Sequence, residues 1–129
     1  AIDWFNRHYM NTYGYPVPEC WSWYIVKQPD KGAIASIGNT GYGYGNLGEW
    51  CVVAGVDNWI TSEFFRVYAK GEASPILGNI YATAISNYIT HFHEFVLPDV
   101  HEGWDPGDLK TVEQWVLLGD PSLQLLPPS

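Results

Sequence analysis

The chain has 129 residues, of which 47% are hydrophobic and 16% aromatic, which is enough for one domain with a real core and argues against disorder. Its formal net charge is -8 with only six Lys and Arg, which excludes a phosphate-binding surface for nucleic acid and a patch for anionic membranes. No apolar run approaches the roughly 20 residues of a membrane span, so we expect no membrane insertion. The acidic, aromatic-rich composition favours an exported protein, extracellular or at the cell surface.

The first predicted helix with a clear start follows Pro18, because proline lacks an N–H and is tolerated in a first helical turn. Trp21 and Tyr24 recur at helical spacing, and the turn residues 29–32 end the pattern. Cys20 lies in this helix. Cys20 and Cys51 are compatible with one disulfide or with two free thiols, and their spacing does not choose between the two.

Residues 32–38, GAIASIG, form a short apolar run bounded by glycines, which is the pattern of a strand buried on both faces in a parallel sheet. The glycine-rich residues 39–48 follow and are predicted to form a loop, because glycine makes regular structure costly. Open α/β sheets bind ligands at the carboxyl ends of their strands. The loop is therefore expected either to line a substrate site or to be a plain surface loop.

Two longer helices are predicted next. The first covers residues 57–70, with Asp57 as its cap and Gly71 as its end. The second begins after Ser74, its cap, and runs to about residue 92 with an apolar stripe wide enough to require burial on a sheet. A short helix over residues 108–117, a turn at 119–121 and an edge strand at 122–126 complete the pattern.

These elements amount to one or two strands with three to four helices. One or two strands do not make a stable sheet, and the helices have apolar faces that must pack on something. The sequence therefore predicts part of an α/β domain, with the remaining strands supplied elsewhere. Residues 1–126 belong to this part, and residues 127–129, which include two prolines, are expected to be a domain end.

The candidate metal ligands are His91, His93 and His101, with Glu94 and Glu102 beside them. Zinc-binding helices place histidines four residues apart, whereas a separation of two puts His91 and His93 on different helix faces. A solvated helix end is the better interpretation, and no metal site is predicted.

The segment 113–125, EQWVLLGDPSLQL, resembles the closing segment of the gingipain-type cysteine peptidases, in which a Trp, a few apolar residues and Gly-Asp-Pro-Ser-Leu end the catalytic domain. The run 32–40 is similar to the last core strand of that family and the loop after it. The resemblance spans about residues 32–126.

The resemblance implies a caspase-like three-layer α/β sandwich, of which this chain is the C-terminal half. It also implies a cysteine endopeptidase whose catalytic His and Cys end two consecutive strands before this segment. Cys20 does not match that cysteine, so the dyad is expected to be absent from the chain, and the chain alone is expected to be inactive.

Further expectations follow from the resemblance. The loop after the last core strand borders the substrate pocket, and it corresponds here to Asn39, Thr40, Gly41 and Tyr42. The expected partners are the N-terminal half of the same domain and a peptide substrate. No cofactor is expected beyond a structural calcium ion, which the family often holds, although no loop here has calcium spacing. The alternative is a non-catalytic surface or binding protein that retains the scaffold.

The closing segment carries a structural expectation. Trp115 and Leu117 are predicted to be buried. Gly119, Asp120 and Pro121 are predicted to form a tight turn that sets the final strand, with the Asp120 carboxylate accepting backbone N–H bonds rather than taking part in chemistry.

Overall fold

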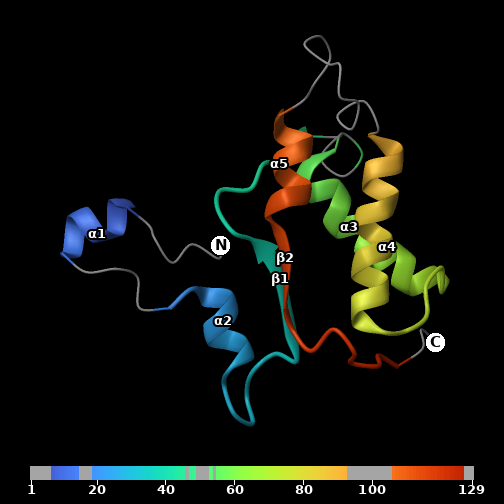
Figure 1. The fold of residues 1–129 in the computed structure, drawn as a ribbon, viewed down its shortest axis with the longest axis horizontal. Helices are drawn as coiled ribbons and strands as arrows, with labels where there is room; N and C mark the ends of the chain where they lie inside the picture. The colour runs from blue at the N-terminus through green and yellow to red at the C-terminus, as the bar shows by residue number, and fades with distance from the viewer. Residues whose placement is uncertain are drawn as a thin grey trace. The chain divides into compact units, whose positions relative to one another are not determined.

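The computed structural model describes residues 7–14, 19–45, 47–48, 53, 55–92 and 106–126 (Figure 1). These residues form five helices and two strands. In chain order they are α1 (Arg7–Tyr13), α2 (Trp21–Val26), β1 (Ala35–Asn39), α3 (Val56–Lys70), α4 (Leu77–His91), α5 (Pro106–Gln114) and β2 (Trp115–Gly119). The predicted partial α/β fold is confirmed, with five helices in place of three to four.

The chain divides into two compact units. The first comprises Ala1–Tyr42 and Gln114–Gly119, and the second comprises Gly43–Glu113 and Asp120–Ser129. The chain therefore passes between the units after Tyr42, after Glu113 and after Gly119.

The first unit is built on a two-stranded sheet in which β1 and β2 run antiparallel, with Ile37 opposite Leu117 at the centre of the register (Figure 1). All five residues of β1 are half-buried. The prediction of a strand buried on both faces of a parallel sheet, over residues 32–38, was therefore wrong within the described residues. A short apolar run does not indicate which strand will pair with it. Here the partner strand is β2, about 80 positions further along the chain.

Helix α2 begins at Trp21, three residues after Pro18, where its first turn was predicted. Cys20 is its N-cap, and the Cys20 Sγ accepts the N–H of Trp23 at 3.4 Å. Cys20 is only 3% exposed, so this helix start lies in the interior of the first unit. The Cys20 thiol therefore caps α2 and is also part of the core of the first unit.

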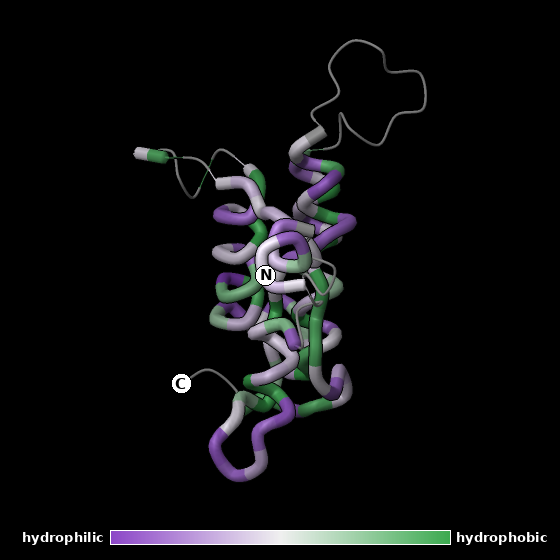
Figure 2. Tube along the Cα trace, turned by 90° about the vertical axis from the view of Figure 1, so that its left-hand side faces the viewer, coloured by the Kyte–Doolittle hydropathy of each residue, from purple (hydrophilic) through white to green (hydrophobic). Residues whose placement is uncertain are grey.

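The core of the second unit lies between α3 and α4, which run side by side in Figure 1. Both helices carry apolar residues at helical spacing, and these pack together. The buried hydrophobic residues of the two helices are Val56, Ile60, Phe64, Val67, Leu77, Ile80, Ala84 and Tyr88. In Figure 2 the helices alternate between hydrophilic and hydrophobic stretches, as expected for elements with one buried face.

The helix ends differ in part from the prediction. Gly71 ends α3 in the left-handed conformation with φ 62°, as its position after the last apolar residue predicts. The cap at the start of α3 is Gly55 rather than Asp57, and the cap of α4 is Ile76 rather than Ser74. In both cases the structure provides no side-chain cap, so the first N–H groups take other acceptors.

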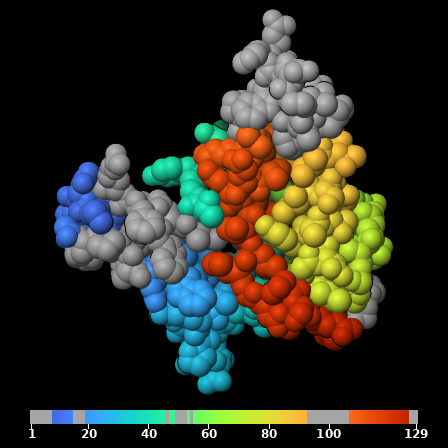
Figure 3. Space-filling view, viewed as in Figure 1, coloured from blue at the N-terminus to red at the C-terminus, as the bar shows by residue number. Residues whose placement is uncertain are grey.

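The C-terminal segment packs on the start of α4. The N–H of Gly78 donates to the carbonyl of Pro121 at 2.8 Å, and that of Leu77 donates to the carbonyl of Leu123 at 2.9 Å. Figure 3 shows this segment, in red, bordering the yellow-green start of α4. The predicted edge strand over residues 122–126 is reduced to a single bridge between Gln124 and Ile76.

The second strand lies elsewhere than predicted. The helix predicted over residues 108–117 ends at Gln114, and Trp115–Gly119 is the strand β2. None of the helices described is long and apolar enough to cross a bilayer.

Candidate functional site

The predicted substrate loop begins at the end of β1. Asn39 is the last residue of the strand, and the N–H of Thr40 donates to the carbonyl of Gln114 at 2.9 Å. Gly41 lies beside the Gln114 side chain, whose Oε1 is 3.5 Å from the position of a Cβ on this glycine. Tyr42 is 80% exposed. The first residues of the loop are therefore held against the start of β2, and Tyr42 presents its ring to solvent.

The predicted turn at the end of β2 is built around Asp120. The Asp120 Oδ1 accepts the N–H of Ser122 at 2.8 Å and the Ser122 hydroxyl at 2.6 Å. These bonds lower the pKa of the Asp120 carboxyl, the hydroxyl contributing more than the N–H. Pro121 follows in the turn, and Gly119 precedes it with φ 134°, a conformation that favours glycine. The geometry makes Asp120 an acceptor within its own turn.

Burial in β2 is uneven. Trp115 is 5% exposed, whereas Leu117 is half-buried. The predicted burial is therefore confirmed for Trp115 and wrong for Leu117. In a strand, Trp115 and Leu117 share one face of the sheet, and only the first of them is enclosed among the described residues.

The residues weighed as nucleophile or metal ligands do not converge in the described part of the chain. Cys20 is a buried free thiol that caps a helix. His91 is exposed at the end of α4. Cys51, His93 and His101 lie outside the described residues, as do Glu94 and Glu102. Within the described ranges no group of three His, Cys, Asp or Glu is placed to hold a metal ion.

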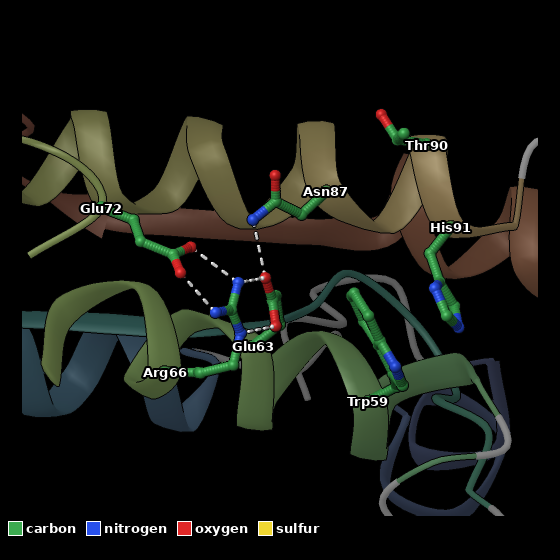
Figure 4. A pocket seen from close by; sticks show the side chains of 7 residues that line it. All are labelled: Trp59, Glu63, Arg66, Glu72, Asn87, Thr90 and His91. Carbon is green, nitrogen blue, oxygen red and sulfur yellow. Dashed lines mark hydrogen bonds and ion pairs between the residues drawn. The ribbon is translucent and has the colours of Figure 1, made fainter. Parts of the chain in front are cut away.

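An open groove of about 480 Å³ lies between α3 and α4 in the second unit. Helix α3 and the turn after it provide one wall, and α4 provides the other (Figure 4). The lining side chains are mostly polar or aromatic: Trp59, Glu63, Arg66, Glu72, Asn87, Thr90 and His91.

The centre of the groove is an ion-pair network around Arg66. Its guanidinium donates from Nε and Nη2 to the two Glu63 oxygens at 2.6 and 2.5 Å. It also donates from Nη1 and Nη2 to the two Glu72 oxygens at 2.5 and 2.7 Å. Asn87 donates to the Glu63 Oε1 at 2.7 Å. These bonds, seen as dashed lines in Figure 4, tie α3 to α4 and to the turn after α3.

The network shifts the acid–base properties of its members. Hydrogen bonds from Arg66 lower the pKa of the Glu63 carboxyl and outweigh the opposing effect of burial. Glu63 raises the pKa of the Arg66 guanidinium, with a further contribution from Glu72. The Glu63 side chain is 7% exposed, so its charge is stable inside the protein because of these donors.

Aromatic rings close the other end of the groove. The Trp59 indole stacks on the His91 ring, with centroids 5.2 Å apart and planes 20° apart. The same indole meets the Tyr88 ring edge to face at 5.3 Å. The shape of the groove comes from packing between the two helices. The N–H donors of Arg66 inside it bind carboxylates of the protein itself.

The sequence contained a signal for only part of this network. Glu63 and Arg66 are three positions apart, a spacing at which helical side chains meet. Glu72 lies beyond the glycine that ends α3, and Asn87 lies on another helix. Neither pairing follows from local spacing.

A second buried network holds the start of α3. The Tyr88 hydroxyl is buried on α4, donates to the Asp108 carboxylate on α5 and accepts the N–H of Val56 at 2.8 Å. Burial, with a smaller contribution from Asp108, raises the pKa of this phenol, so the hydroxyl remains protonated and able to donate. Val56 has φ 51°, which is unusual for a β-branched residue, and the bond to Tyr88 fixes it there. One hydroxyl thus joins α3, α4 and α5.

Comparison with known proteins agrees with the closing motif. The sequence model of peptidase family C25 matches residues 6–126, nearly the whole chain. Neither the curated proteins nor the solved structures gave a match. The match includes the loop after β1, both networks of the second unit and the turn at Asp120. The chain therefore belongs to peptidase family C25, the gingipain family.

Proposed function

We propose that this chain is the C-terminal portion of a gingipain-like cysteine endopeptidase. In this proposal the chain completes the core of the domain and provides one wall of the substrate cleft through Asn39, Thr40, Gly41 and Tyr42. The catalytic His and Cys are supplied by sequence outside these 129 residues. The observation that carries the proposal is the family match over residues 6–126.

The environment of Cys20 supports the absence of the nucleophile. A catalytic thiolate must reach the substrate carbonyl, and reactive cysteines lie in partly exposed, electropositive surroundings. Cys20 is 3% exposed, and its sulfur accepts a backbone N–H at the start of α2. Its position suits a structural thiol.

The sheet supports the need for a partner. In an antiparallel pair, alternate residues bond across the ladder and the residues between them point their N–H and C=O groups outward. The N–H of Thr40 bonds to Gln114, which is the next position of the register after Asn39 and Trp115. The backbone groups of Gly38 and Ser36 therefore bond across to β2, and the N–H and C=O of Ile37 point away from β2. A sheet of two strands is marginal in water. We infer that the N-terminal half of the peptidase domain adds strands to this sheet.

Folding of the 129-residue chain tests the partner. The chain alone is expected to elute as an expanded or associated species and to melt without a sharp transition. Co-expression with the preceding part of the natural protein should give a stable complex with one sharp transition. A tight monomer that melts cooperatively by itself would count strongly against this role.

Peptide hydrolysis tests the enzymatic part. The intact protein is expected to cleave peptides and to lose activity with iodoacetamide, whereas Cys20→Ser should retain the activity of the parent. Loss of activity in Cys20→Ser with an unchanged melting temperature would identify Cys20 as the nucleophile. An intact protein that is folded and binds peptides without cleaving them would favour the alternative, a non-catalytic surface or binding protein on the same scaffold.

We propose the location of the protein from its composition. A net charge of -8 and a 16% share of aromatic residues suit a protein that acts extracellularly or at the cell surface. Fractionation of the source cells, followed by detection of the chain in medium or surface extracts, checks this proposal.

A further inference from the structure

Helix α3 begins without a side-chain cap. The N-cap Gly55 has φ 97° and no side chain to accept a hydrogen bond. The first N–H groups of a helix have no intrahelical acceptor and need one from outside. The N–H of Val56 takes the Tyr88 hydroxyl at 2.8 Å, and the N–H of Asp57 takes the backbone carbonyl of Tyr44 at 3.2 Å. The glycine-rich loop thus provides one of the caps of α3.

Two further contacts fix this part of the loop. The Lys110 Nζ on α5 lies 4.0 Å from the centroid of the Tyr44 ring, within the range of a cation–π interaction. Gly45 lies so close to α3 that a Cβ there would be 2.6 Å from the Asn58 Oδ1. Residues 44–45 therefore lie against α3, where Gly45 leaves room for the Asn58 side chain and Lys110 lies over the Tyr44 ring.

The exposed ring of the candidate loop lies next to this anchor in the sequence. Tyr42 is 80% exposed, and only Gly43 separates it from Tyr44. A hold on Tyr44 therefore limits the backbone conformations that are open to Tyr42 through the chain that joins them.

We propose that Lys110 is a positioning residue, which fixes the candidate substrate loop by holding the Tyr44 ring and thereby keeping the Tyr44 carbonyl on the Asp57 N–H. Lys110 acts through Tyr44 and does not touch the peptide. This inference rests on the proposed function, in which Asn39, Thr40, Gly41 and Tyr42 line the cleft. Neither Lys110 nor Tyr44 belongs to the sequence motif that resembles the gingipain peptidases.

Amide hydrogen exchange in the intact protein, resolved by NMR, tests the anchor. Exchange of the Asp57 amide reports whether the Tyr44 carbonyl is in place, and the Val56 amide, bonded to Tyr88, is an internal control at the same helix end. Lys110→Met should accelerate Asp57 exchange about two- to five-fold, as expected for the loss of a partly exposed cation–π contact, with Val56 unchanged. Lys110→Arg should restore the slow exchange.

Matched variants complete this arm. Tyr44→Leu should accelerate Asp57 exchange as Lys110→Met does, whereas Tyr44→Phe keeps the ring and should leave the rate unchanged. Lys31→Met removes the same charge from an exposed turn and should also have no effect. Unchanged Asp57 exchange in both Lys110→Met and Tyr44→Leu would overturn the anchor. Equal acceleration of Val56 would also overturn it, because that result means general loosening of the helix.

Peptide cleavage by the same variants tests the link to substrate. Lys110→Met should raise KM about two- to five-fold with kcat unchanged, because substrate binding must then order a loop that Lys110 no longer holds in place. Unchanged KM together with faster Asp57 exchange would overturn positioning of substrate by this loop. An intact protein without any cleavage activity would contradict the proposed function, and the exchange measurements alone would then decide whether Lys110 holds the loop.

Discussion

Glu63 is a charged side chain enclosed between two helices, at 7% exposure, and its carboxylate is stable there because Arg66 and Asn87 donate to it. The Arg66 bonds hold the pKa of Glu63 below its ordinary value of 4.5. A carboxyl whose pKa is lower in the folded state stabilises the protein above the unfolded pKa, and this contribution is lost as the pH falls through the folded value. The Glu63 contribution should therefore be complete at pH 7 and should disappear below about pH 4.5.

Glu63→Gln is expected to lower the free energy of unfolding at pH 7 by about 1.5 to 3 kcal/mol, the range for hydrogen bonds that involve a charged group. The variant should also lose stability less steeply than the parent below about pH 4.5. Urea unfolding at a series of pH values from acid to neutral measures both effects. Glu113→Gln, an equal charge change at an exposed position on α5, is the control and should follow the parent curve.

Tyr88 makes a sharper case, because its ring is fully buried and its hydroxyl has partners on two other helices. Tyr88→Phe preserves the packing but leaves the Val56 N–H and the Asp108 carboxylate without this partner. We expect a loss of about 2 kcal/mol in the free energy of unfolding, since unsatisfied buried groups cost about 1 to 3 kcal/mol. Tyr24→Phe, at a ring that is 53% exposed, removes a hydroxyl without this cost. Equal urea midpoints for the two variants would contradict the role of Tyr88.

At this scale the sequence predicts some side-chain roles better than others. The turn motif at residues 119–121 and the glycine that ends α3 depend on local backbone chemistry, which a short sequence reveals. Asp108 was expected only to begin a helix, and Tyr88 only to belong to an apolar stripe. Their bond joins residues 20 positions apart on different helices, so it depends on a packing geometry that no local pattern contains.

Among the elements, α4 depends on an unusual close contact at its first turn. Gly78 lies against Pro121, and a Cβ at position 78 would be 2.9 Å from the Pro121 carbonyl oxygen and 3.0 Å from its Cβ. Replacing glycine by alanine inside a helix ordinarily adds about 1 kcal/mol of stability. Here the contact is with backbone, which cannot move aside without shifting the turn.

Gly78→Ala should therefore lower the free energy of unfolding, by about 1 to 3 kcal/mol as for other overpacked sites. Ala82→Gly on the exposed face of α4 is the reference for helix propensity and should cost about 1 kcal/mol. Chemical denaturation of the two variants and the parent measures both. A Gly78→Ala protein more stable than the parent would show that α4 and the turn are less closely packed than the structure indicates.

Strand β2 shows why element prediction failed in one place. Residues 113–119 contain no glycine or proline before Gly119, and a helix read through them meets no stop signal. The apolar run at 115–118 is too short for its periodicity to distinguish helix from strand. Pairing with β1 decides the outcome, and that pairing comes from the other end of the chain. Helices α3 and α4, whose apolar stripes are long, were predicted nearly in full.

For the whole molecule, the buried residues are distributed unevenly. Of the ten buried hydrophobic residues described, only Cys20 and Trp115 belong to the first unit, and the other eight belong to the second. Hydrophobic burial is the main source of folding stability, so the second unit should hold most of it. The first unit also contains the two-stranded sheet and three exposed aromatic side chains on α2, Trp21, Trp23 and Tyr24.

Hydrogen exchange of the chain alone should therefore be slowest in α3 and α4 and fast in β1 and β2. If the proposed N-terminal half of the peptidase domain adds strands to this sheet, its addition should slow exchange in β1 and β2 at least ten-fold, with a smaller effect on α3 and α4. The isolated chain incubated with an unrelated soluble protein is the control. Equal protection of strands and helices in the chain alone would mean that the first unit needs no partner.

The thiol that caps α2 is also a probe of local opening in the first unit, because its alkylation rate depends on how often the helix start opens. An alkylating reagent reaches Cys20 only when the helix start opens, because the sulfur is buried and engaged by the Trp23 N–H. In a variant whose Cys51 is replaced by Ser, the ratio of the labelling rate to that of an unfolded peptide gives the population of the open state directly. The Cys20 labelling rate, measured before and after addition of the proposed N-terminal half, would then report how much binding of that half reduces the opening of the α2 start.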